Sequence, residues 1–251
     1  MRLLLPPSET KEQGGTGPAV DLSALYAPSL RDARLQVIER LVELCQDEGE
    51  ARRVLKLGDR LRGEVEVDRV VLRSPTRRAL ERYTGVLYDA LDAGSLSGRD
   101  WAAAGRRIIV QSALFGPVRA DDAIPAYRLS ATTGRPVGPL KRHWTRATAG
   151  VWDEEEFIVD ARSESYRALS PVPEHVPHVY VRVLSGNGSG AALNHFNKAA
   201  KGRLASAVIR SADEASSARE LVDWARAEGM SFDLDAAAPG EVILWDQHGA
   251  A

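Results

Sequence analysis

The sequence predicts an α/β domain in which a mixed sheet is packed by helices. Short apolar runs typical of buried strands are interspersed with amphipathic stretches typical of helices, without the regular strand–helix repeat of a doubly wound sheet. The 251 residues could form one large domain or two small ones. No internal repeat, low-complexity tract or clear linker divides them, so we expect a single domain over residues 1–251.

The chain begins with an apolar segment, residues 1–5, that is expected to be a strand inside the sheet. Two prolines end the strand, and the loop after them carries hydroxyl groups, an amine and glycines: Ser8, Thr10, Lys11, Gly14, Gly15 and Gly17. Such a loop can bind an anion, because glycine lets the backbone approach a ligand closely. The GxxxxGK[ST] spacing of a nucleotide triphosphate loop is absent, and a surface loop without a ligand is the alternative.

Most of residues 30–94 is expected to be helical. Apolar residues recur at three- and four-residue steps from residue 30, as in an amphipathic helix, and a break is expected near Gly49. A weaker extended segment at residues 65–72 leads to Ser74 and Pro75, which have the pattern of an N-cap followed by proline at the first helical position. A second helix should follow Pro75 and close at Gly94.

A Gly/Ser connection, GSLSG, joins that helix to another one before the strand at residues 108–110. Two helices joined by a tight turn can present backbone amides to a nucleic-acid phosphate, as helix-hairpin-helix elements do. Most such connections are only turns, so both interpretations stay open. Tyr83 and Tyr88 on the first helix are expected in the core or at its rim rather than stacked on bases.

Residues 111–130 are the predicted rim of the functional site. They follow the buried strand at residues 108–110 and contain Gly116, Pro117, Arg119, Asp121, Asp122, Pro125, Tyr127 and Arg128. Binding and catalytic groups concentrate on loops that a rigid strand positions. The two arginines suit phosphates, whereas the two carboxylates leave base recognition, catalysis or a salt bridge to a neighbouring arginine open.

The second half of the chain adds strands and helices that carry further cations. Trp144 lies in a basic cluster and could stack on bases or anchor a helix on the core. Strands are expected at residues 157–159 and 178–186, and a GNGSG turn after the latter. The next helix carries Lys198, Lys201 and Arg203 in its first turns, and a helix, a turn and a closing strand end the chain.

Composition excludes several classes of protein. The single cysteine, Cys45, excludes an internal disulfide and a zinc thiolate cluster, and its helical spacing with apolar residues favours a buried position. The pair His175 and His178 lies between prolines in an expected exposed turn, so we predict no metal site. No apolar run is long enough to span a membrane or form a signal peptide, so we expect a soluble, cytoplasmic protein without membrane contact.

The net charge of -2 says little about partners, but its distribution is informative. Residues 52–82 and 99–146 carry a basic surplus, whereas residues 153–174 and 213–246 are acidic. This asymmetry can give a positive cleft and a negative back, although solvated charge on both faces is the plain alternative.

Four loop and helix segments could converge if their strand ends share one edge of the sheet. Their cations and hydroxyl groups would bind a nucleic acid or another anion through Ser8, Thr10, Lys11, Arg119, Arg128, Lys198, Lys201 and Arg203. If the protein is an enzyme, the predicted catalytic groups are Lys11, Asp121 and Tyr127, as acid, base or nucleophile. A lysine among other cations can have a lowered pKa and form a Schiff base.

Several segments in order resemble the YaaA peroxide-stress protein family: LLPPSETK, LGDRL, RYTGVLYDAL, SALFGPVRADDAIPAYRLS, LKRHW, VDARSESY and NKAAKGRLAS. The resemblance implies the "cantaloupe" α/β fold, a basic cleft, a helix-hairpin-helix element, a cytosolic location and binding of double-stranded or distorted DNA during peroxide stress. Carried over by residue, it marks cleft positions at Lys11, Arg119, Asp121, Pro125, Tyr127, Arg128, Lys201, Gly202 and Arg203.

Two functions are therefore expected from the sequence. The first is a DNA-binding stress protein without catalysis, and the second is an enzyme on a nucleobase, nucleotide or other small anionic metabolite. An interaction module without cleft chemistry is a third possibility. We expect no cofactor, and the sequence does not predict an oligomeric state. A long open groove would favour DNA, and a closed pocket a metabolite.

Overall fold

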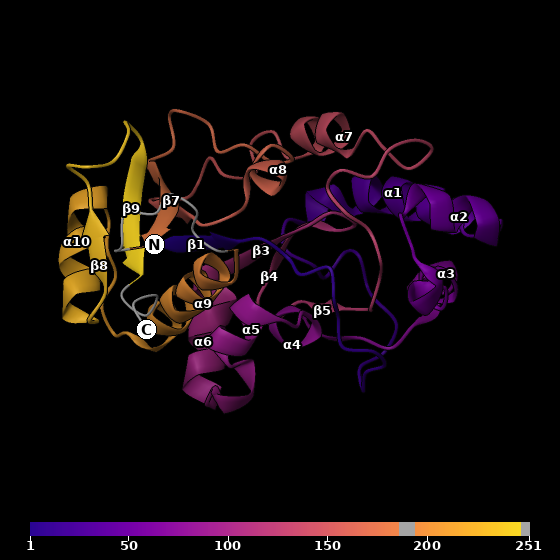
Figure 1. The fold of residues 1–251 in the computed structure, drawn as a ribbon, viewed down its shortest axis with the longest axis horizontal. Helices are drawn as coiled ribbons and strands as arrows, with labels where there is room; N and C mark the ends of the chain where they lie inside the picture. The colour runs from indigo at the N-terminus through magenta and orange to yellow at the C-terminus, as the bar shows by residue number, and fades with distance from the viewer. Residues whose placement is uncertain (186–193, 247–251) are drawn as a thin grey trace.

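A twisted sheet of seven strands, in the order β4-β3-β1-β6-β7-β9-β8, forms the centre of the computed structural model, which describes residues 1–185 and 194–246 (Figure 1). The strands are β1 (Arg2–Leu5), β3 (Ile108–Ser112), β4 (Gly116–Arg119), β6 (Ile158–Asp160), β7 (His178–Ser185), β8 (Ser231–Asp233) and β9 (Glu241–Asp246). A small antiparallel pair, β2 (Arg77–Arg78) with β5 (Ala123–Ile124), lies outside this sheet. The predicted mixed sheet packed by helices is confirmed.

The five central strands run parallel, and only the edge strands β4 and β8 are antiparallel to their neighbours. Leu3 and Leu5 face the main core, whereas Leu4 belongs to a second apolar cluster with Trp152 and Ile158. Both faces of β1 are therefore covered, as is usual for parallel strands. Because the strands are parallel, the segments that leave their carboxyl ends start from the same edge of the sheet.

The helices are α1 (Arg31–Leu44), α2 (Glu48–Val54), α3 (Glu64–Arg69), α4 (Ala79–Arg82), α5 (Val86–Leu91), α6 (Gly98–Arg107), α7 (Leu140–Ala147), α8 (Glu164–Arg167), α9 (Asn194–Arg210) and α10 (Ala218–Ala227). Short 3-10 helices lie at Pro28–Leu30, Asp59–Leu61, Val71–Arg73 and Ala93–Ser95. Figure 1 shows α4, α5, α6 and α9 gathered below the sheet, and α1, α2 and α3 at the end away from β8 and β9.

The predicted helix after residue 30 is present, but its break lies earlier than expected. Helix α1 ends at Leu44, and the Asp47 side chain accepts a hydrogen bond from the Glu50 backbone N–H to begin α2. Cys45 is buried at this junction, as its spacing predicted. Burial raises the pKa of its thiol to about 12, so the thiolate is disfavoured.

The prediction of an extended segment at residues 65–72 is wrong. This region forms α3 and a 3-10 helix, because Val65 and Asp68, three residues apart, both turn inward. Ser74 is also not an N-cap, since its hydroxyl donates to the Val70 carbonyl and no helix begins at Pro75. The next helix begins only at Ala79, after β2.

The single helix expected before Gly94 is divided into α4 and α5. Tyr83 is extended and forms an isolated bridge with Lys11, and the Thr84 backbone N–H donates to the Thr10 carbonyl at 3.3 Å. Gly85 then takes φ +95°, a value that suits glycine. The loop after β1 therefore interrupts the helix by pairing with it.

Trp144 anchors α7 on the core. Its ring is fully buried, its Nε1–H donates to the Ala113 carbonyl at 2.8 Å, and it packs against Gly116. Of the two alternatives for this residue, the structure supports the anchor. The predicted GNGSG turn lies outside the described residues.

Candidate functional site

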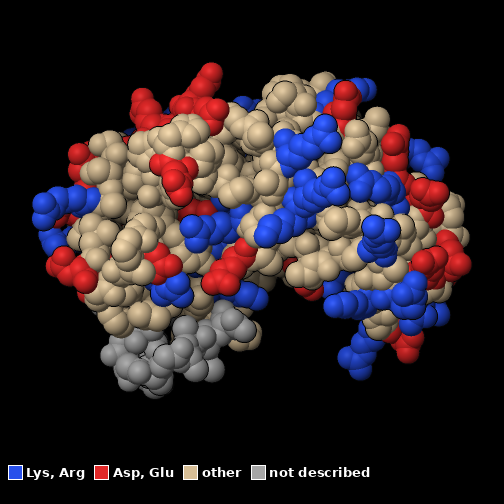
Figure 2. Space-filling view, turned by 90° about the horizontal axis from the view of Figure 1, so that it is seen from above, with Lys and Arg blue, Asp and Glu red and all other residues tan. Residues whose placement is uncertain are grey.

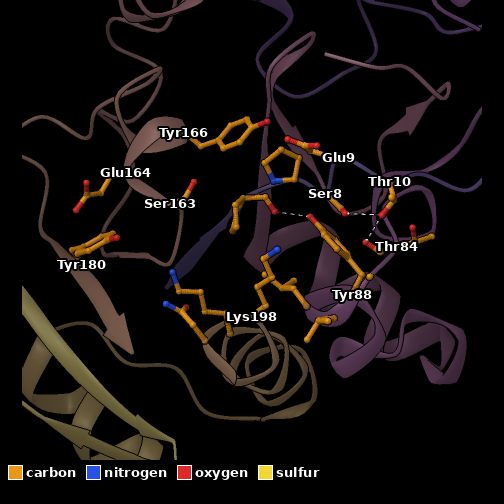
Figure 3. Close-up of a pocket in the computed structure, with 17 residues that line it drawn as sticks. Ser8, Glu9, Thr10, Thr84, Tyr88, Ser163, Glu164, Tyr166, Tyr180 and Lys198 are labelled. Atoms are coloured by element: carbon orange, nitrogen blue, oxygen red, sulfur yellow. Dashed lines mark hydrogen bonds between the residues drawn. The ribbon is translucent and has the colours of Figure 1, made fainter. Parts of the chain in front are cut away.

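A cavity of about 580 Å³ lies beside the carboxyl ends of the parallel strands (Figure 3). Its walls come from the loop after β1, the start of α5, the segment around α8, one residue of β7 and the first turns of α9. This volume is in the range of small-molecule sites. The cavity brings together two of the four segments that were expected to converge, the loop after β1 and the first turns of α9.

One wall is built from hydroxyl groups around Gly85. The Ser8 and Thr10 hydroxyl oxygens are 3.1 Å apart, and the Thr10 hydroxyl donates to the Thr84 carbonyl at 3.5 Å (Figure 3). A Cβ atom on Gly85 would lie 3.6 Å from both of these hydroxyl oxygens. Glycine thus satisfies the positive φ and leaves room beside the two hydroxyl groups.

The opposite wall carries Ser163, Glu164, Tyr166 and Tyr180, which Figure 3 shows across the cavity from Ser8 and Thr10. The Arg167 guanidinium lies 4.6 Å from the centre of the Tyr180 ring and fixes this ring from behind. Tyr166 and Tyr180 are not among the site residues predicted from the sequence, because Tyr180 lies inside a strand and its alternation with apolar residues does not show which tyrosine faces a cavity.

Lys198 and Lys201 of α9 supply the positive charge. They are three residues apart and share a helix face, but Lys198 is exposed whereas Lys201 is only 6% exposed. Burial lowers the pKa of Lys201 to about 8, against the opposing attraction of Asp160. A Cβ on Gly202 would come within 2.1 Å of the Leu87 carbonyl oxygen, so α9 packs directly on the α5 backbone here.

A buried ion pair lies under this region, at the carboxyl end of β6. The Asp160 carboxylate accepts hydrogen bonds from Arg162 Nε at 2.9 Å and a terminal guanidinium nitrogen at 2.7 Å, and both side chains are buried. Burial acts to raise the pKa of Asp160, but the adjacent Arg162 holds it below its ordinary value. Arg162 also donates to the Gln111 side chain at 3.2 Å, which links β6 to β3.

Lys11 lies behind the hydroxyl wall and is not one of the cavity's lining residues. Its ammonium donates to the backbone carbonyls of Ser8 at 2.9 Å and Glu9 at 3.3 Å, and lies 4.0 Å from the centre of the Tyr127 ring. Burial lowers the pKa of Lys11 to about 7, although the nearby Asp68 opposes this shift. Lys11 therefore holds the loop that forms the wall.

Tyr127 is also placed behind the cavity. Its hydroxyl lies 3.0 Å from the Tyr83 hydroxyl and 2.8 Å from that of Ser112, and the side chain is buried. Burial raises the pKa of the Tyr127 phenol well above its ordinary value. The Tyr127 ring therefore packs against the Lys11 ammonium and does not face the cavity.

Arg119 and Asp121 lie at the other edge of the sheet. Strand β4 turns back along β3, so Arg119 is opposite Ile109 near the amino end of β3. Arg119 Nε is 3.6 Å from Asp121 and 3.4 Å from the buried Asp122 carboxylate, and Asp122 also accepts the Tyr26 backbone N–H. Of the alternatives for these carboxylates, the geometry corresponds to the salt bridge, and the expected convergence of this segment with the cavity is wrong.

Arg128 and Arg203 are near the cavity but do not line it. The Arg128 guanidinium pairs with the Glu9 carboxylate at 2.8 Å and lines a separate cavity of about 260 Å³ on the far side of Glu9. The Arg128 backbone N–H donates to the buried Asp68 carboxylate at 2.7 Å. Arg203 follows Lys201 by two residues on α9, which turns it toward a different side.

Basic side chains are not spread evenly over the surface. Figure 2 shows Lys and Arg in a band across the middle of one face, toward the half that holds α1, α2 and α7 in Figure 1, with most acidic side chains near the margin.

Within residues 1–185 and 194–246, no cluster of three or more His, Cys, Asp or Glu side chains could hold a metal ion. His175 pairs instead with Asp153 at 3.1 Å. In the same part of the chain, no helix is both long and apolar enough to cross a bilayer.

Comparison with known proteins gives matches along most of the chain. A family model described as peroxide stress protein YaaA matches residues 1–236. A UPF0246 protein of Corynebacterium efficiens is 42% identical over 244 residues, covering 94% of this chain and 96% of the relative. A UPF0246 protein of Streptomyces coelicolor is 40% identical and covers 96% and 95%. An uncharacterized protein of Campylobacter jejuni is 26% identical and covers 82% and 83%.

Proposed function

Because the chain belongs to the peroxide stress protein YaaA family, we propose that it acts in the cytoplasm during peroxide stress by binding DNA. The observation that carries the proposal is the cavity at the carboxyl edge of the sheet, with two lysines on one wall and hydroxyl groups on another. Phosphate oxygens are bound by such charged and uncharged donors. Lys198 and Lys201, with Ser8 and Thr10, are the proposed phosphate contacts.

The aromatic side chains of the cavity give the proposal its second part. Tyr166 lines the same space as the lysines and is partly exposed, whereas Tyr88 and Tyr180 contribute to the wall but are buried. Tyrosine rings can stack on bases without regard to sequence, while cations hold the backbone. One nucleotide would thus find a phosphate contact and a stacking surface within a single cavity.

The size of the cavity restricts the form of DNA that can enter. A volume of about 580 Å³ suits a single nucleotide and not a duplex. Distorted or forked DNA offers unpaired nucleotides, and the basic band of Figure 2 would hold the adjoining backbone. The proposal has two further parts. We assign a helix-hairpin-helix role to α5, the 3-10 turn at Ala93–Ser95 and α6. We also propose that the chain has the "cantaloupe" fold.

Fluorescence anisotropy with labelled forked DNA tests the proposal. We expect binding at about 50 mM salt, with log affinity falling linearly as log salt rises. Lys198→Ala should weaken binding and reduce the salt slope by about one, because one phosphate contact is lost. The matched control is Arg226→Ala, which removes an exposed cation of α10 that is paired with Asp223. Equal effects of the two substitutions, or no binding at low salt, would contradict the proposal.

A second candidate function is an enzyme for a small anionic metabolite in the same cavity. It is favoured by the size of the site, because the segments that line it bound a volume suited to one small molecule. Lys201 is the buried amine of the cavity and the candidate for this function, since Lys11 lies behind the wall and Asp121 at the other edge of the sheet. Incubation with a panel of nucleobases and nucleotides, read by mass spectrometry, tests for turnover.

A further inference from the structure

We propose that Lys201 forms a reversible imine with the carbonyl carbon of an aldehyde that also carries a phosphate group. The inference rests on the proposed function of the cavity as a phosphate site, and it adds covalent chemistry to that site. The two groups it needs, an amine and a set of phosphate donors, lie in the same cavity.

Lys201 differs from the other lysines of the chain in its surroundings. The side chains of Lys56, Lys141 and Lys198 are exposed to solvent. Lys11 is partly buried, but its ammonium donates to two backbone carbonyls and lies against Tyr127. Among the described residues, the Lys201 amine has no hydrogen-bond or ion-pair partner, and its side chain is 6% exposed at the cavity.

Burial keeps a usable fraction of this amine neutral. With its pKa lowered to about 8, Lys201 is uncharged in about a tenth of molecules at pH 7, against less than about a thousandth for an ordinary lysine. Only the neutral amine attacks a carbonyl. The other titratable groups around the cavity are Asp160 beneath it and, along its walls, Glu9, Tyr88, Glu164, Tyr166, Tyr180 and Lys198.

The reaction balances without an oxidant or a reductant. The lone pair of Lys201 Nζ attacks the carbonyl carbon, and one amine proton moves to the carbonyl oxygen to give a carbinolamine. The carbon–oxygen bond then breaks, the second amine proton leaves with that oxygen as water, and the carbon–nitrogen double bond forms. Hydrolysis reverses both steps and restores the free amine.

The phosphate requirement follows from the neighbours of Lys201. Lys198 presents a charged amine from the same face of α9, and the hydroxyl groups of Ser8 and Thr10 line the facing wall. A phosphate held there would keep a carbonyl of the same molecule close to Lys201. Two kinds of molecule carry this pair of groups: a free sugar phosphate, and a DNA strand with an abasic sugar in its aldehyde form.

Borohydride trapping of the full-length chain tests the proposal. Glyceraldehyde 3-phosphate in one arm, and an oligonucleotide with one abasic site in the other, are each incubated with the protein at pH 7.5 and reduced with sodium borohydride, which converts the imine to a stable amine. Peptide mapping by mass spectrometry then locates the adduct. We expect it on Lys201, at least about tenfold above Lys141, because burial lowers the pKa of Lys201 to about 8 and the phosphate contacts lie in the same cavity.

Two variants and one reagent serve as controls. Lys201→Arg keeps the positive charge and cannot form an imine, so the adduct should disappear while circular dichroism stays unchanged. Lys141→Arg should leave the adduct at its original level. Propionaldehyde, which has no phosphate, should label Lys201 at least about tenfold less than the phosphorylated aldehyde, because the charged contacts at the cavity are unused.

The outcomes separate this inference from the proposed function. An adduct on Lys201 from either arm supports it, and the arm that gives more adduct identifies the source of the aldehyde. Labelling spread over the exposed lysines, labelling retained in Lys201→Arg, or no adduct in either arm would overturn it. Anisotropy with intact forked DNA, measured on the same preparation, reports on DNA binding independently of imine formation.

Discussion

At the scale of single residues, the burial of a lysine side chain and its contacts, and not the residues next to it in the sequence, determine its pKa and its role in the site. Lys11 and Lys201 both have lowered pKa values, and in both burial is the largest cause. Their surroundings nevertheless differ, because Lys11 is bound to backbone carbonyls while Lys201 is at the cavity. The same physical effect thus gives one lysine that supports a loop and one that is available to a ligand.

Replacement of Lys201 by methionine should stabilise the protein in a pH-dependent way. The folded-state pKa of about 8 is below the ordinary value of 10.5, so folding is penalised while both states hold the proton, at pH values below 8. Between pH 8 and about 10 the unfolded state holds more protons, and stability of the natural protein rises with pH. Lys201→Met should therefore raise the free energy of unfolding at pH 7 by on the order of 1–3 kcal/mol.

Urea unfolding of both proteins at pH 7 and pH 10 measures this effect. The difference between Lys201→Met and the natural protein should shrink at pH 10, because the lysine of the folded protein is then neutral and most of the penalty for burying its charge is gone. Lys141→Met, at an exposed site of α7, is the matched control and should change stability by less than about 0.5 kcal/mol. A gain in stability that is the same at both pH values would show that methionine acts through packing alone.

At the scale of elements, the contact between α5 and α9 positions the lysine wall. Gly202→Ala should disturb this contact, because the new Cβ would lie 2.1 Å from the Leu87 carbonyl oxygen and 2.8 Å from the Ala90 Cβ. We expect a loss of about 1–3 kcal/mol in unfolding free energy together with weaker DNA binding. Gly98→Ala on α6 meets nothing within 4 Å and should be neutral or slightly stabilising.

The break between α4 and α5 is equally important for the hydroxyl wall. Gly85→Ala would place a side chain at φ +95°, a backbone conformation that alanine disfavours by about 1 kcal/mol or more. The added methyl group would also contact the Ser8 and Thr10 hydroxyl oxygens. Chemical denaturation should show the loss in stability, and anisotropy a reduced DNA affinity. Unchanged affinity would remove this wall from the proposed phosphate site.

Local patterns predicted those elements whose burial is encoded nearby. The apolar runs of β1, β3 and β6, and the helical spacing of apolar residues in α1, were sufficient to predict these elements. Each of them satisfies its own backbone hydrogen bonds or lies inside the sheet. The α4–α5 break was not predictable, because it depends on the Lys11 to Tyr83 bridge between distant segments. Residues 65–72 were mistaken for a strand because their alternating valines satisfy a period of two as well as a helical face.

At the scale of the whole molecule, topology decided which predicted site residues meet. Ser8, Thr10, Lys198 and Lys201 meet because β1 is parallel to the central strands and α9 covers the same edge. Arg119 and Asp121 do not, because the chain reverses after Phe115 and β4 carries them to the other edge. Sequence shows which groups follow a strand, but not whether the next strand returns along it.

The whole surface also determines which DNA the protein should prefer. On the proposed function, a cavity of about 580 Å³ would take up one nucleotide, while the basic band would contact the DNA backbone without regard to sequence. We therefore expect a duplex with a short single-stranded gap to bind at least about tenfold more tightly than a fully paired duplex of the same length and end structure. Competition anisotropy on duplexes that share the same blunt, G·C-paired ends measures this ratio, because stably paired ends leave few unpaired nucleotides outside the gap.

The salt dependence of the two DNA forms should separate the cavity from the basic band. Both forms would use the band, and gapped DNA would add the phosphate contact of Lys198 in the cavity, so its affinity should fall with a slope steeper by about one as salt rises. Stacking in the cavity should add a further advantage for the gapped form that is less sensitive to salt. Tyr166→Ala should lower the affinity for gapped DNA by about 1–3 kcal/mol and leave the paired duplex unaffected. Equal losses for both forms would mean that the cavity does not take up an unpaired nucleotide and that DNA binds through surface charge alone.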